Sequence, residues 1–107
     1  MVNEVILIPT LQSKLTKQHA LIVLALKRKL ERMGEHALKR LDTEGEWMLG
    51  EMKLHRPPYR LYVFADTKNR KYYLVMWEHK DVQQKIINEL RLKLHQSTQF
   101  SVEKLFE

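Results

Sequence analysis

Basic and protonatable side chains are concentrated around one short stretch of this sequence, KLHRPPYRLYVF, which runs from residue 53 to residue 64. Nearby cationic or protonatable residues are Lys53, His55, Arg56, Arg60, His79 and Lys80, and Lys68, Arg70 and Lys71 follow near a turn. Residues two apart on a strand share a face, so Lys53 and His55 are expected to point the same way. The pattern predicts a cationic patch on a β-sheet.

A cationic patch of this kind can bind a phosphodiester, and it can also cleave RNA. The ribose 2′-hydroxyl is itself a nucleophile, so cleavage needs a base, an acid for the leaving 5′-oxygen and fixed positive charge on the phosphorane. Arginine supplies permanent charge, whereas lysine and histidine also transfer protons. The alternative is that these are ordinary solvated side chains on an exposed sheet face, and residue types alone favour that alternative.

Net charge supports a nucleic-acid partner. The 107-residue chain carries 19 Lys and Arg against 13 Asp and Glu, a net charge of +6. The excess lies before residue 81, because residues 81–107 are balanced. Phosphate neutralisation supplies most of the affinity of nucleic-acid binders, so this charge predicts nucleic-acid binding. The alternative is an acidic protein partner, or no partner at all.

Metal, cofactor and thiol chemistry are not expected. Cysteine is absent, and the five histidines are scattered without ligand spacing. No Gly-rich phosphate loop or other catalytic signature occurs, so a small-molecule ligand is not expected either. The first apolar run ends at Pro9 after an acidic residue, unlike a signal peptide, and no run is long enough to cross a membrane. We expect a cytoplasmic protein.

The first part of the chain predicts a strand and a helical hairpin. Residues 5–8 are β-rich and stop at Pro9, after which Thr10 is a candidate helix cap. Apolar residues then recur at spacings of three and four through residue 37, with a polar break at residues 16–19. Gly34 is the expected helix stop. Residues 34–45 are charged and end in turn residues.

The second part predicts three strands and a helix. The candidates are residues 46–55, 59–65 and 71–77, joined by loops too short for crossover helices, so an antiparallel meander is expected. Asp81 is the expected N-cap of a final amphipathic helix. We predict a single domain over residues 1–107, of two-layer α+β class with helices on one sheet face, and a tail, residues 97–107, of uncertain structure.

The segment EWMLGEMKLHRPPYRLYVFADTKNRKYYLVMWEHKDVQQKIINEL resembles the RelE/ParE superfamily of bacterial toxins, and within it the HigB-like branch. The similarity lies in an ordered set of features: an apolar-basic strand, a short bend, YR opening the central strand, a polar hairpin, an apolar strand and a basic pair before the last helix. With the preceding strand and helical hairpin it covers residues 4 to about 94.

This resemblance implies a small α+β ribonuclease fold that acts on messenger RNA in the ribosomal A site without a metal. It also implies a type II toxin-antitoxin system, with a cognate antitoxin as partner. Arg60 would stabilise the phosphorane, and Lys53 would stabilise its negative charge or assist deprotonation of the 2′-hydroxyl. His79 or Lys80 would act at the leaving 5′-oxygen. Lys39 and Arg40 match a basic lead-in that contacts RNA or ribosome in relatives.

Some features depart from the family, and alternatives remain open. The RelE branch has a tyrosine in the last helix, whereas residues 83–87 contain none, and His95 is a candidate replacement. The ParE branch inhibits DNA gyrase and needs no such set, and a non-catalytic, toxin-like binding protein is the third alternative. An antitoxin surface is expected along the helical hairpin, where Leu21, Val23 and Leu24 are either that surface or, the interpretation we favour, core.

Overall fold

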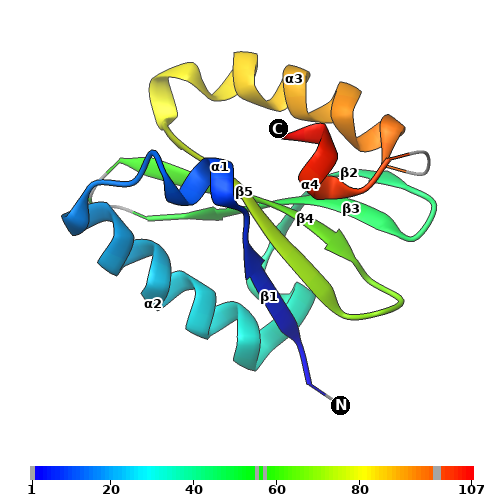
Figure 1. Cartoon of the computed structure of the whole chain (residues 1–107), viewed down its shortest axis with the longest axis horizontal. Coiled ribbons are helices and arrows are strands. Elements are labelled where there is room, and N and C mark those ends of the chain that lie inside the picture. Colours follow the sequence, from blue (N-terminus) through cyan, green and yellow to red (C-terminus); the bar gives the residue numbers. More distant parts are fainter. Residues whose placement is uncertain (1, 55, 57, 98–99) are drawn as a thin grey trace.

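The computed structural model describes residues 2–54, 56, 58–97 and 100–107. The elements in chain order are β1 (Glu4–Leu7), α1 (Pro9–Gln12), α2 (Lys17–Met33), η1 (Gly34–Ala37), β2 (Lys39–Glu44), β3 (Trp47–Lys53), β4 (Tyr59–Asp66), β5 (Lys71–His79), η2 (Lys80–Val82), α3 (Gln83–Gln96) and α4 (Val102–Leu105). Figure 1 shows the helices arranged around a central sheet.

The strands form one five-stranded mixed sheet in the order β1-β5-β4-β3-β2. The expected antiparallel meander is confirmed as β3, β4 and β5, and β1 pairs parallel with β5. A further strand, β2, pairs antiparallel with β3 across a turn at Gly45, whose φ of 59° favours glycine. Strand β2 was not predicted from the sequence because its KRLDTE segment is charged, which an edge strand tolerates.

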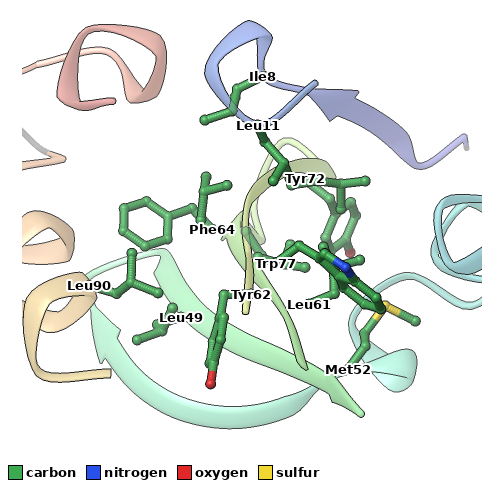
Figure 2. Packing of buried hydrophobic residues seen from close by; sticks show 14 of the residues in the cluster. Ile8, Leu11, Leu49, Met52, Leu61, Tyr62, Phe64, Tyr72, Trp77 and Leu90 are labelled. Atoms are coloured by element: carbon green, nitrogen blue, oxygen red, sulfur yellow. The ribbon is translucent and has the colours of Figure 1, made fainter. Parts of the chain in front are cut away.

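The α+β class is confirmed, but helices cover both faces of the sheet rather than one. Residues 61–65 of β4 are all fully buried, so successive side chains on both faces need cover. Figure 2 shows Leu49 and Phe64 on the side of Leu90 from α3, whereas Leu61 and Trp77 point to the other side, toward α2. The continuous apolar pattern of β4 therefore indicates a strand between two helical layers.

The helix boundaries confirm one expected signal and correct two. Gly34, at φ 58°, ends α2 as expected. Thr10 is not a cap; it lies inside α1, whose N-cap is Ile8, and its hydroxyl donates to the carbonyl of Phe106. Asp81 is not the N-cap of the last helix either, because it lies in η2, where its backbone N–H donates to His79 Nδ1. Within the described residues, no helix has the length and apolarity needed to span a membrane.

The C-terminal tail completes the core on the α3 side of the sheet. Val102 and Phe106, in and after α4, are buried. The Phe106 ring packs edge-to-face on Phe64 at a centroid distance of 5.4 Å, and Lys93 Nζ lies 5.2 Å from the Phe106 ring centroid. Lys93 Nζ also donates to the carbonyl of Leu105 at 2.9 Å. The tail is therefore part of the domain.

Phe106→Ala is expected to lower the free energy of unfolding by about 3 kcal/mol, because the cavity left against Phe64 can only partly collapse. Phe100→Ala in the same tail is the matched control, since Phe100 is 44% exposed, and it should change stability by less than about 0.5 kcal/mol. Urea denaturation of both variants measures this. Equal, small losses would show that the tail does not contribute to the core.

Candidate functional site

Lys53 and Arg60 are direct cross-strand partners at one end of the β3–β4 ladder. Directly opposite residues project from the same face with Cβ atoms about 5 Å apart, so the register brings these two side chains together. Lys39 of β2 pairs with Glu51, two positions from Lys53, and so shares that face. We call Lys39, Lys53 and Arg60 the basic triad; it lies on the face that α3 covers.

Arg60 is held by a buried acidic residue of the same face. Its Nε lies 3.9 Å from Glu51 Oε1, and the side chains of Arg60 and Glu51 are 16% and 2% exposed. Gln83 Nε2, at the start of α3, donates to Glu51 Oε2 at 2.9 Å. A carboxylate buried this deeply requires a counter-charge, and Arg60 provides it. Arg60 therefore stabilises the fold in addition to any role toward a phosphate.

Tyr62 adjoins this ion pair, because it is the cross-strand partner of Glu51. Burial of the phenol, together with the nearby Glu51 charge, raises the pKa of Tyr62 to about 12. Its hydroxyl has no hydrogen-bond partner within the described part of the chain. Tyr62 thus keeps its proton at neutral pH and is a poor general base.

His79 lies on the opposite face from the basic triad. Its cross-strand partner is Tyr59, whereas Arg60 pairs with Glu78 on β5. Because side chains alternate along a strand, His79 projects away from the face of Arg60. Lys80 is exposed just after β5, and its backbone N–H donates to the carbonyl of Pro58 at 2.9 Å. Of the four predicted catalytic residues, Lys53 and Arg60 lie side by side because of the strand register. His79 lies on the opposite face of the sheet from both.

Four of the other predicted RNA contacts, Lys68, Arg70, Lys71 and Arg40, lie apart from the basic triad. Lys68, Arg70 and Lys71 lie at the β4–β5 turn, at the far end of β4 from Arg60, roughly 23 Å away along the strand. Arg40 pairs with Gly50, so it faces away from Lys39. Arg56 is exposed after β3, and His55 lies outside the described residues.

His95 is also remote from the basic triad. Its Nδ1 lies 2.7 Å from Glu44 Oε2, and its Nε2 lies 3.7 Å from Asp42 Oδ2. Both carboxylates belong to β2 near the β2–β3 turn, whereas Lys53 ends β3. His95 therefore links α3 to β2. Among residues 2–54, 56, 58–97 and 100–107, no three His, Asp or Glu side chains are grouped in a way that could hold a metal ion.

A hollow that sequence analysis missed lies beside the end of β5. It has a volume of about 340 Å³, and its lining includes Lys14, His19, Tyr59, Trp77 and His79. These residues are distributed over the α1–α2 connection, α2, β4 and β5. No spacing rule in the sequence connects residue 14 with residue 79, so only the tertiary structure identifies the site.

Comparisons of the chain with protein-family models, curated proteins and solved structures found no match. The assignment of function therefore depends on the residues and geometry of the sites themselves.

Tyr62→Phe is expected to reduce the loss of stability at high pH. The pKa of Tyr62 is about 12 in the folded protein, against about 10 in an unfolded chain. Its contribution to stability is therefore complete below pH 10 and is lost between pH 10 and 12. From pH 9 to pH 11 the parent should lose about 1 kcal/mol more than Tyr62→Phe, measured by urea denaturation. Parallel pH curves would contradict the raised pKa.

Arg60→Met is expected to lower the free energy of unfolding by about 3 kcal/mol, because it leaves Glu51 charged and buried. The double variant Arg60→Met/Glu51→Gln should recover most of this loss, since the glutamine is neutral and can still accept a hydrogen bond from Gln83. Chemical denaturation of the single and double variants measures the coupling. Additive losses would show that the two side chains are independent.

Proposed function

We propose that this protein is a RelE/ParE-type toxin of a type II toxin-antitoxin system and cleaves messenger RNA on the ribosome without a metal. The observation that supports this most directly is the cross-strand pair of Lys53 and Arg60, the two residues that the resemblance assigns to phosphate chemistry. The topology is compatible with the proposal, since the helical hairpin precedes the antiparallel strands and a helix follows them.

In the proposed reaction the 2′-hydroxyl of RNA attacks the adjacent phosphorus, and the basic triad stabilises the negative charge that develops. Lys53 is exposed and lies next to Arg60, which supports the proposed roles of contacting the phosphate and assisting deprotonation. Of the two candidates for protonating the leaving 5′-oxygen, we favour Lys80. It is exposed after β5, whereas the register turns His79 away from Lys53.

A cognate antitoxin is the proposed protein partner, and α2 offers an apolar surface for it. Leu21 is 65% exposed and Leu24 is 41% exposed, whereas Val23 is 1% exposed. From the sequence, a core position was the favoured prediction for all three. That prediction is confirmed for Val23 and wrong for Leu21 and Leu24, which lie on the solvent side of the amphipathic helix.

A second candidate function is non-catalytic binding, of nucleic acid or, as in the ParE branch, of DNA gyrase. The buried pair of Arg60 and Glu51 favours it, because an arginine already neutralised by a carboxylate has less charge to offer a phosphorane. The separation of His79 from the basic triad favours it too. Transcript integrity distinguishes the two candidates.

Induced expression of the parent in bacteria is expected to arrest translation and to produce cuts within codons of translated messages. Lys53→Ala should reduce cleavage about 100-fold, because it removes one group that stabilises the transition state. Lys29→Ala, an exposed change on α2, is the matched control and should cleave like the parent. Mapping of transcript 5′ ends measures cleavage. To test the role of Arg60 in cleavage, Arg60→Lys is a better variant than Arg60→Ala, because lysine preserves a positive charge beside Glu51.

If transcripts stay intact and DNA damage signalling appears, the protein would be a gyrase inhibitor and not a ribonuclease. If transcripts stay intact and growth is not arrested, the remaining candidate would be a non-catalytic binding protein. Cleavage that is equal in Lys53→Ala and Lys29→Ala would show that Lys53 does not act in catalysis.

A further inference from the structure

The hollow of about 340 Å³ beside β5 is large enough for one small ligand, since ligand sites usually measure about 300–1,000 Å³. Part of its wall is the strand segment 75–79. The β1–β5 register ends at Leu7 and Leu74, so this segment has no strand neighbour on that side within the described residues. A polar ligand in the hollow would therefore meet backbone donors and acceptors of a strand edge.

Aromatic rings form the second part of the wall. Tyr59 lies at their centre, with ring-centroid distances of 4.6 Å to His19, 5.1 Å to Trp77 and 5.5 Å to His79. All three contacts are edge-to-face, with interplanar angles from 83° to 85°. Mutual packing of this kind fixes the ring orientations, and aromatic side chains are the usual partners of unstacked nucleic-acid bases.

Among the described residues, each of the two histidines has one ring nitrogen that makes no hydrogen bond. His19 Nδ1 accepts a hydrogen bond from Trp77 Nε1 at 3.1 Å, so the neutral ring carries its proton on Nε2. His79 Nδ1 accepts from the backbone N–H of Asp81 at 3.1 Å and lies 3.3 Å from its Oδ2. In His79 too, therefore, Nε2 is the ring nitrogen that remains for a ligand. His19 Nε2–H is a donor, and His79 Nε2–H is one as well while its Nδ1 accepts from Asp81. Donors suit an acceptor-rich, anionic group.

Charge completes the match to an anion. Lys14 contributes an exposed ammonium group to the lining. Glu78 also belongs to the lining, but it is the cross-strand partner of Arg60, so its carboxylate projects from the opposite sheet face to Tyr59 and His79. The anionic part of a ligand would thus meet Lys14 and the two imidazoles.

We propose that this hollow is a nucleotide-binding site, in which the ring cluster of Tyr59 and Trp77 contacts the base and Lys14 with His19 and His79 binds the phosphate. The same chemistry is present in a free mononucleotide and in the terminal nucleotide of a single-stranded RNA. The site does not depend on the proposed ribonuclease function, because it shares no residue with the basic triad. It differs from the expectation, drawn from the sequence, that a small-molecule ligand does not bind.

The test uses the fluorescence of Trp77 in the full-length Trp47→Phe variant. Trp47 pairs with Asp66 at the opposite end of β4 from Tyr59, so its removal leaves a single tryptophan at the site. Adenosine and uridine 5′-monophosphates, a 5′-phosphorylated hexanucleotide RNA, its unphosphorylated form, inorganic phosphate and adenosine are titrated separately. We expect saturable quenching by a nucleotide with both base and phosphate, and weaker binding of phosphate or adenosine alone.

Lys14→Ala should weaken nucleotide binding about tenfold, through loss of one charged contact. Lys17→Ala is the matched control, an exposed lysine three residues away that is absent from the lining, and it should bind like the parent. Unchanged thermal unfolding of both variants excludes a folding effect. Quenching by mononucleotides assigns a free nucleotide; quenching by the phosphorylated RNA alone assigns an RNA terminus, and either supports the site. The proposal is overturned if neither a mononucleotide nor the phosphorylated RNA quenches Trp77 at millimolar concentration, if inorganic phosphate binds equally well, or if the two lysine variants bind alike.

Discussion

Strand β4 has no solvent-facing side along its middle, and the positions of the helices follow from this constraint. Residues 61–65 are fully buried in succession, so both faces of the sheet need an apolar cover. Helix α2 supplies one cover, and α3 with the C-terminal tail supplies the other (Figure 1). Each large apolar side chain buried in this way contributes about 1.5–3 kcal/mol. If one of the two helical layers were absent, the side chains on that face of β4 would be exposed to water.

The same double burial gives the basic triad its unusual environment. Glu51 lies on the face beneath α3, where Gln83 reaches it from the first turn of that helix. Its charge is removed from water, and Arg60, 3.9 Å away, compensates it. The ion pair with Glu51 and the proposed contact with a phosphate would therefore compete for one guanidinium group. Exposed Lys53 is under no such competition, and so it is the better reporter of function.

Prediction from sequence succeeded where the signal was local. The periods of the apolar residues located α2, α3 and the three meander strands, and Gly34 marked the end of a helix. It failed where a long-range partner decided the outcome. Strand β2 is charged and exists because β3 offers it an edge, and the hydroxyl of Thr10, an expected helix cap, instead donates to the carbonyl of Phe106, 96 residues further along the chain.

The features of the candidate site likewise fall into those that the sequence predicted and those that it did not. The sequence by itself determined which residue types stand on which strand, and the bend between β3 and β4 made Lys53 and Arg60 a plausible pair. Only the tertiary structure decided that they face each other, that Glu51 is buried beside them, and that His79 projects to the other face with Tyr59. The physical reason is strand register: a shift of one residue moves every side chain to the opposite face, and long-range pairing sets that register.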